Sequence, residues 1–100
     1  MEENNIFVTV NHLDDYMPII ALKPGDILTM KKDQNNLYDD EAIAVYNEHE
    51  CKVGYVANSV ATVVRGTYSA GRIYDKIEDE QRCKIQFVCS EEGFAIGKIA

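Results

Sequence analysis

Short runs in which apolar and polar residues alternate recur along this chain, and they constrain its fold more than any other feature. Alternation with a period of two is typical of strands that bury one face. Turn sequences such as KPGD at 23–26 and SEEG at 90–93 separate the runs. The pattern therefore predicts strands at residues 6–10, 27–32, 42–46, 52–56, around 85–87 and around 94–96. Many short strands with little helix predict a small, mainly β fold, a β-barrel or half-barrel.

One helix is expected between Asn58 and Gly66. Asparagine is a favoured N-cap, glycine commonly ends a helix, and three valines between these residues would form an apolar stripe. Because valine lowers helix propensity, tertiary packing would have to hold this helix. The segment Arg72–Ile77 fits either a strand or a helix, and we favour a strand.

The charge of the chain limits what it can bind. With 100 residues the sequence fits a single domain, and its net charge is −7 from 17 acidic and 10 basic residues. This balance argues against broad electrostatic binding to nucleic acid or to an anionic membrane. The acidic excess lies in residues 1–50, so a local neutral or basic surface on residues 51–100 stays open.

The cysteine pattern indicates a reducing compartment, and the short apolar runs indicate a soluble protein. The chain has 3 cysteines and no C-x-x-C spacing, which fits neither a disulfide framework nor a zinc site. The start, MEENNIFVTV, does not resemble a secretory signal, and no apolar run approaches the roughly 20 residues of a membrane span. We expect a soluble, cytoplasmic protein with three unpaired cysteines, no metal, no cofactor and no membrane partner.

Two short segments imitate functional motifs. DQNNLYDDE at 33–41 places oxygen-bearing residues at alternate positions, but an EF-hand needs glycine and glutamate where Tyr38 and Ala44 stand. GTYSAG at 66–71 has Thr67 where a nucleophile elbow requires glycine. Neither histidine of the chain belongs to a recognisable catalytic set, so we expect no enzymatic activity.

Three blocks of the sequence resemble the HIRAN domain, a small module of DNA-repair translocases that also occurs alone in bacteria. They are GDILTMKKDQNNLYDDEAIAVY at 25–46, KVGYVANSVATVVRGT at 52–67 and SAGRIYDKI at 69–77, and the resemblance extends from about Ile6 to Val88. The first block is similar to the family's N-x-Y-D-x-x-A-I-x-V signature, which is met by Asn36, Tyr38, Asp39, Ala42, Ile43 and Val45.

The resemblance implies a single OB-like β-barrel with one or two short helices, which binds 3′ ends of single-stranded DNA in repair or replication. Tyr38 and Asn36 would meet the terminal nucleotide and its phosphate, and Asp39 would engage the free 3′-hydroxyl. A carboxylate can accept that hydrogen bond, and an aromatic ring can stack on any base. Further phosphate contacts would come from His12 together with Arg65 or Arg72.

An alternative is a structural or protein-interaction module that keeps the barrel without DNA binding. Tyr38 would then cover the end of the barrel, and Asp39 would cap a turn. The net charge favours this alternative, and so does the segment VNHLDDYM at 10–17, where Asp14 and Asp15 add negative charge and Tyr16 is displaced from the family's usual position. The sequence identifies neither a protein partner nor an oligomeric state.

Overall fold

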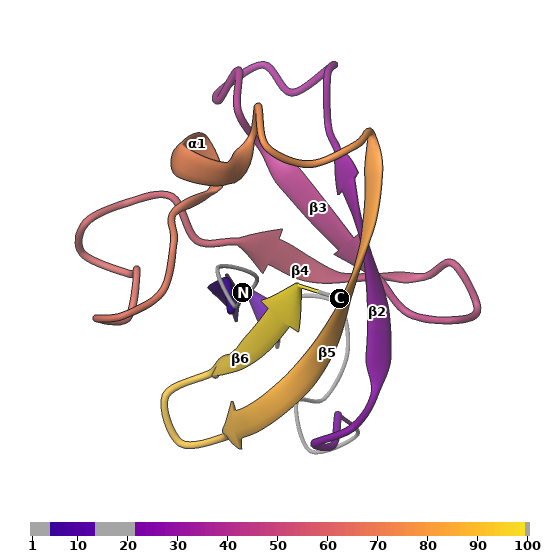
Figure 1. The fold of residues 1–100 in the computed structure, drawn as a ribbon, viewed down its shortest axis with the longest axis vertical. Coiled ribbons are helices and arrows are strands. Elements are labelled where there is room, and N and C mark those ends of the chain that lie inside the picture. Colours follow the sequence, from indigo (N-terminus) through magenta and orange to yellow (C-terminus); the bar gives the residue numbers. More distant parts are fainter. Residues whose placement is uncertain (1–4, 14–21, 100) are drawn as a thin grey trace.

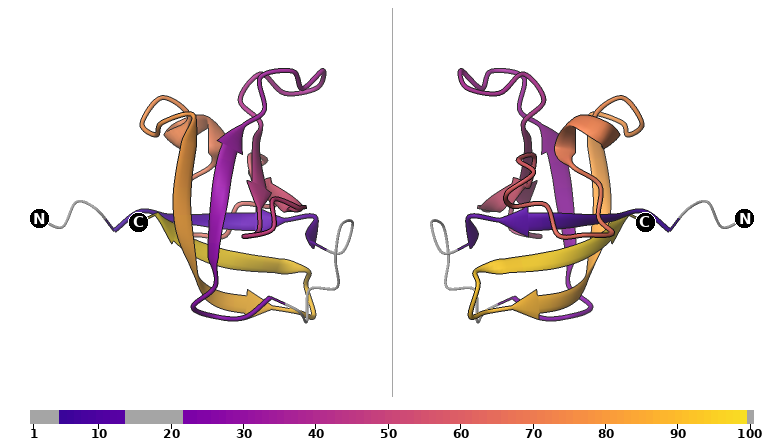
Figure 2. Two further views of the ribbon diagram at one scale, coloured as in Figure 1. Left: turned by 90° about the vertical axis from the view of Figure 1, so that its right-hand side faces the viewer. Right: turned by 90° about the vertical axis from the view of Figure 1, so that its left-hand side faces the viewer.

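Six antiparallel strands close into a barrel (Figures 1 and 2). The structure is a computed structural model that describes residues 5–13 and 22–99. Around the barrel the strands follow the order β1-β4-β3-β2-β5-β6, and β6 pairs with β1 to close it. The strands are β1 (Phe7–Asn11), β2 (Ile27–Lys32), β3 (Ile43–Tyr46), β4 (Lys52–Val56), β5 (Glu80–Cys89) and β6 (Phe94–Ile99). The predicted mainly β barrel is therefore confirmed.

Apolar side chains from all six strands fill the barrel, and a few residues outside the strands complete the core. The largest fully buried side chains include Val8, Val10, Leu13, Met30, Ile43, Val45, Val53, Ile73 and Ile85. On β5 the simple alternation fails after Ile85, because a bulge lies between Ile85 and Phe87. A bulge places an extra residue in one strand and shifts the faces that follow. Phe87 is consequently 66% exposed although Ile85 is buried.

The helix lies later in the chain than predicted. Residues 59–63 and 65–67 form turns and bends, so the helix expected from Asn58 to Gly66 is wrong. The strand favoured for Arg72–Ile77 is also wrong, because its first residues belong to α1 (Ala70–Ile73) and turns follow. Ser69 is the N-cap of α1, and its side chain accepts a hydrogen bond from the Arg72 amide. Within residues 5–13 and 22–99, no helix is long and apolar enough to cross a membrane.

The segment between β4 and α1 is tied to β1 by hydrogen bonds rather than by helix packing. The amide of Val64 donates to the hydroxyl oxygen of Thr9 at 3.1 Å, and the hydroxyls of Thr9 and Thr67 are 2.8 Å apart. Farther along, the Tyr68 amide donates to the carbonyl of Phe7 at 2.7 Å. These bonds fix the course of residues 59–68 along the barrel wall.

Candidate functional site

The loop between β2 and β3 projects beyond the body of the barrel (Figure 2), and Asn36 shapes its tip. The Oδ1 atom of Asn36 accepts hydrogen bonds from the amides of Tyr38 at 2.8 Å and Asp39 at 3.0 Å. Its Nδ2 atom lies 3.4 Å from Oδ2 of Asp33, at the base of the loop. An asparagine that bonds to the backbone two and three residues later stabilises a turn. The side chain of Asn36 therefore orients the two residues that follow.

Tyr38 stands out from this loop into solvent. It is 95% exposed, and its neighbour Leu37 is 91% exposed. A tyrosine that covered the end of the barrel would be largely buried, so the covering role considered from the sequence is wrong. An exposed aromatic ring is available to stack on a flat ligand.

Asp39 does cap a turn, as one sequence interpretation predicted. Its Oδ1 atom accepts a hydrogen bond from the amide of Glu41 at 2.9 Å. Its Oδ2 atom accepts one from Nδ2 of Asn58 at 3.1 Å. An ionised carboxylate offers about four lone-pair positions, so these two bonds leave acceptor capacity for a ligand. The turn role and a binding role are compatible.

A second set of side chains holds the base of the loop. The hydroxyl of Tyr55, on β4, donates to Oδ2 of Asp33 at 3.2 Å. The ammonium of Lys52, also on β4, donates to the Tyr55 hydroxyl oxygen at 2.8 Å. The loop is thus attached to β4 through Asp33 as well as through Asn58.

The loop forms one wall of an open pocket of about 610 Å³. The ends of β1 and β4 and the segment that follows β4 provide the other walls. The pocket is lined by Asn11, His12, Asn36, Tyr38, Asp39, Ala42, Tyr55, Val56, Ala57, Asn58, Ser59 and Thr62. Four residues selected from the sequence therefore border one space: His12, Asn36, Tyr38 and Asp39.

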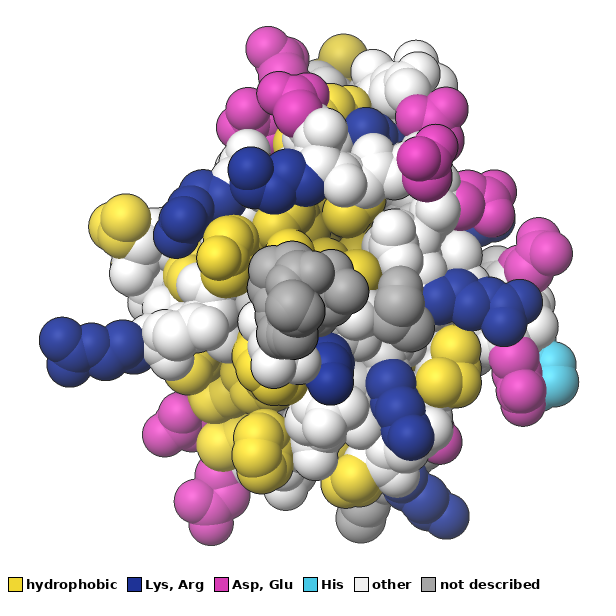
Figure 3. Space-filling model, in the orientation of Figure 1, with side chains coloured by type: hydrophobic (Ala, Val, Ile, Leu, Met, Phe, Trp, Pro, Cys, Tyr) yellow, Lys and Arg dark blue, Asp and Glu magenta, His cyan; other side chains and the backbone are white. Residues whose placement is uncertain are grey.

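The two arginines expected at the site do not line this pocket. The guanidinium of Arg72 lies 4.4 Å from the centre of the Tyr68 ring, and Arg65 is exposed on a turn. On the face seen in Figure 3, Lys and Arg side chains are scattered between Asp and Glu. Within the described chain, Asp39 and His12 are the ionisable acid and base of the lining, and no lysine or arginine belongs to it. Asp14, Asp15 and Tyr16 lie outside the described residues.

Neutral polar side chains supply most of the hydrogen-bonding groups of the pocket. Three asparagines, at positions 11, 36 and 58, line it together with Ser59 and Thr62. The sequence interpretation gave Asn58 a different role, as a helix cap, and gave Tyr55 none although it belongs to the block KVGYVANSVATVVRGT at 52–67. These side chains make the pocket suited to hydrogen bonding with sugar hydroxyls and base edges.

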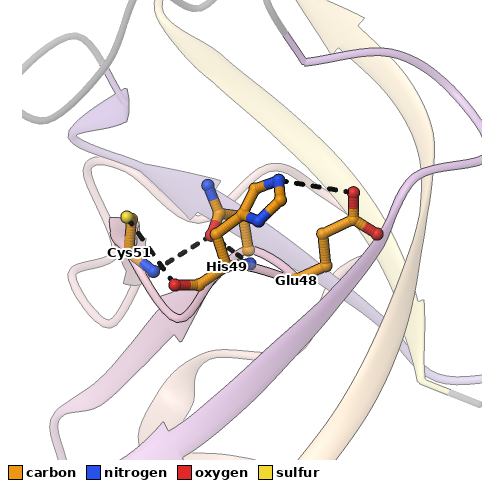
Figure 4. Close-up of polar contacts among 4 residues, drawn as sticks. Glu48, His49 and Cys51 are labelled. Atoms are coloured by element: carbon orange, nitrogen blue, oxygen red, sulfur yellow. Dashed lines mark hydrogen bonds and ion pairs between the residues drawn. The ribbon is translucent and has the colours of Figure 1, made fainter.

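The hairpin between β3 and β4 brings a cysteine, a histidine and a glutamate close together without forming a catalytic set (Figure 4). The Cys51 thiol donates to the backbone oxygen of His49 at 3.8 Å, while Nε2 of His49 faces Oε2 of Glu48 at 3.7 Å. A nucleophile and its base must be within hydrogen-bond reach of each other, which this thiol and imidazole are not. Cys83 is buried in the core, and burial raises the pKa of its thiol to about 12.

Comparisons with known proteins agree with the fold. A family model described as the HIRAN domain matches residues 5–92. A solved protein from Lactobacillus plantarum superposes with a TM-score of 0.65 at 16% identity, covering 94% of this chain and 88% of that one. The HIRAN domain of human HLTF superposes with a TM-score of 0.65 at 17% identity, covering 96% of this chain and 74% of that one. No curated protein matches the chain.

Proposed function

Because the chain belongs to the HIRAN domain family, we propose that it is a non-enzymatic module that binds the 3′ end of single-stranded DNA in repair or replication. One observation carries this proposal. Asn36, Tyr38 and Asp39, from one loop, border the same open pocket as His12, which lies far from them in the sequence. The pocket offers an exposed ring that can stack on a base, beside a carboxylate that can accept a hydrogen bond from a hydroxyl.

Each pocket residue has a distinct part in this proposal. The ring of Tyr38 stacks on the terminal base, which it can do with any base. Asp39 accepts a hydrogen bond from the 3′-hydroxyl with a lone pair that its turn contacts leave unused. A 3′-phosphate would instead be repelled by the carboxylate. Asn36 holds both residues in place through their amides, and His12 faces the adjoining phosphate.

The charge of the lining limits the number of phosphate contacts. No lysine or arginine of the described residues lines the pocket, so binding depends on the end of the strand rather than on its length. Arg65 and Arg72 would contact only phosphates beyond the terminal nucleotide. We expect one to three phosphate contacts, each adding about 0.7 to the salt slope for a single strand. A steep salt dependence that grows with oligonucleotide length would contradict end binding.

Matched oligonucleotides that carry a 3′-hydroxyl or a 3′-phosphate test the proposal by fluorescence anisotropy at low salt. A charge-assisted hydrogen bond contributes about 1.5–3 kcal/mol, so the hydroxyl end should bind roughly tenfold or more tightly. Asp39→Asn should reduce this preference, because an amide carries no charge and can donate to phosphate. Tyr38→Ala should weaken both ligands together.

Two neighbours in the same loop provide matched controls. Asp40→Asn removes one negative charge from an exposed residue that does not line the pocket, so it should leave the hydroxyl preference unchanged. Leu37→Ala removes an equally exposed apolar side chain outside the lining, so it should leave affinity unchanged. Equal affinity of the unmodified protein for the two ends would show that Asp39 does not read the hydroxyl.

The lack of lysine and arginine in the described lining also supports the alternative, a structural or protein-interaction module. The same titration separates the two functions. If the folded protein binds neither oligonucleotide at low salt, DNA binding is excluded and the interaction module is favoured.

A further inference from the structure

Asn58 occupies the point where three segments of the chain meet at the pocket. Its Oδ1 atom accepts a hydrogen bond from the Gly71 amide at 2.8 Å, within α1. Its Nδ2 atom donates to Oδ2 of Asp39 at 3.1 Å, in the loop before β3. Two backbone hydrogen bonds also fix the preceding residue, Ala57. Its amide donates to the carbonyl of Thr9 at 2.7 Å, and its carbonyl accepts from the amide of Ala70 at 3.0 Å.

The orientation of the Asn58 amide follows from its partners. A backbone N–H can only donate, so the atom facing Gly71 must be the oxygen. The amino group is therefore directed at Asp39, whose carboxylate can only accept. The Asp39 bond uses one of the two hydrogens on Nδ2. Asn58 also lines the pocket, which leaves a donor beside the acceptor that Asp39 supplies.

Gly71 permits this close approach. A Cβ atom at this position would lie 3.2 Å from Oδ1 of Asn58 and 2.6 Å from Oε1 of Glu41. The absence of a side chain thus allows α1 to dock against both the amide and the loop that carries Asp39. The amide of Asn58 couples the position of Asp39 to the start of α1 and to β4.

From this geometry we propose that Asn58 positions Asp39 and, together with it, recognises a hydroxyl group, an inference that rests on the proposed function. A hydroxyl can donate one hydrogen bond and accept others. Asp39 accepts the hydrogen of the ligand hydroxyl, and the second N–H of Asn58 donates to the oxygen of that hydroxyl. A terminal phosphate cannot donate to Asp39, so this donor–acceptor pair selects the hydroxyl.

Asn58→Asp is the sharpest test because it changes the chemistry and keeps the shape. The new carboxylate still accepts from the Gly71 amide, but it faces Asp39 without a hydrogen to donate. We expect the affinity for the 3′-hydroxyl end to fall about tenfold or more at pH 7, with the fold intact. Two carboxylates that share a site retain a proton more readily than one. The shared proton can replace the Asn58–Asp39 hydrogen bond but not the second N–H donor, so acidification to about pH 5 should restore the affinity of this variant only in part.

The pH comparison needs the unmodified protein at each pH. His12 and Glu41 are ionisable groups near the same site and are present in both proteins, so the ratio between variant and unmodified protein removes their contribution. No recovery in acid, with the variant folded, would overturn the positioning of Asp39 by Asn58. Full recovery in acid would overturn the donation from Asn58 to the ligand hydroxyl, because the protonated carboxyl has only one hydrogen and gives it to Asp39.

Two variants control for loss of structure. Asn47→Asp makes the same substitution at an asparagine outside the pocket, whose Oδ1 atom accepts from the amides of His49 and Cys51. Ser69→Ala removes the side-chain cap of α1 and leaves the Asn58 contacts in place. Both should keep the unmodified affinity for the hydroxyl end. A similar loss of affinity in Ser69→Ala would assign the effect to α1 instead.

An NMR measurement without DNA separates this inference from the proposed function. In ¹⁵N-labelled protein, Asp39→Ala should shift the side-chain amide signals of Asn58, and Asn58→Ala should shift the backbone amide of Gly71. If the unmodified protein binds neither end, the proposed function and the hydroxyl recognition fail, and these shifts alone decide the positioning role. If it prefers the hydroxyl and Asn58→Asp keeps the unmodified affinity for the hydroxyl end, the inference fails while the proposed function stands.

Discussion

Replacing Thr9 with valine should destabilise the barrel through a single unpaired donor. Thr9 lies on β1 and is fully buried. The hydroxyl of Thr67 donates to the Val64 carbonyl at 2.6 Å, so its only hydrogen is already used. The hydroxyl of Thr9 must therefore donate to Thr67, and its oxygen accepts from the Val64 amide. The buried hydroxyl of Thr9 thus bonds to both Val64 and Thr67, the two ends of a turn in the segment between β4 and α1.

The expected cost follows from what valine leaves behind. Valine has nearly the same shape as threonine, so the core keeps its packing, but the Val64 amide loses its acceptor. A buried donor left without a partner costs about 1–3 kcal/mol, and because Val64 is only half-buried we expect the lower part of that range, about 1–2 kcal/mol. For a domain of this size each kcal/mol lowers the melting temperature by about 4–8 °C, so we expect a drop of roughly 4–16 °C.

Urea unfolding gives the global cost, and hydrogen exchange at the Val64 amide locates it. Thr9→Ser keeps the hydroxyl and loses a methyl group, so it should cost about 1 kcal/mol without raising exchange at Val64. Thr29→Val changes a half-buried threonine on β2 and should be nearly neutral. If Thr9→Val is as stable as the unmodified protein and the Val64 amide stays protected, the hydroxyl does not hold this segment.

Two further predictions concern buried positions. Because burial raises the pKa of the Cys83 thiol to about 12, this thiol stays protonated at pH 8. Iodoacetamide should therefore modify the exposed Cys51 first and Cys83 only on unfolding. Mass spectrometry that finds Cys83 modified in the native protein would contradict this prediction. Gly54→Ala should destabilise by about 1–3 kcal/mol or more in urea unfolding, because its Cβ would collide with the backbone oxygen of Asn11. The same change at Gly71 should be milder, since the nearest atom belongs to a flexible side chain and alanine favours the helix; equal costs at the two positions would refute this explanation.

The strands were predictable because alternation is a local signal that the barrel preserves. The strands expected at 27–32 and 52–56 coincide with β2 and β4. The exposure of Phe87 was not predictable in the same way. It depends on a bulge between Ile85 and Phe87, and a bulge is defined by the register of β5 against β6, which are separated by a turn. A period of two cannot reveal where a partner strand inserts this shift.

The misplaced helix has a different physical cause. The expected helix relied on three valines, which are poor helix formers, and the backbone there bonds to Thr9 and forms turns instead. The helix that the described residues form, α1, begins after Ser69 and is only 4 residues long. A stripe with a period of 3.6 is hardly visible over so few residues, so propensity alone could not locate it.

The pocket was half predictable, and Asn58 shows why the other half was not. The signature in the loop before β3 directed attention to Asn36, Tyr38 and Asp39, all of which line the pocket. Asn58 was expected to be a helix N-cap, which is wrong, although its side-chain oxygen does accept a backbone N–H. An N-cap would take that N–H from two or three residues ahead, whereas here it comes from Gly71, 13 residues later. An asparagine oxygen that accepts a backbone N–H therefore indicates a helix start if the donor is assumed to be nearby in the sequence. It indicates a wall of the pocket once the donor is known to be the distant Gly71.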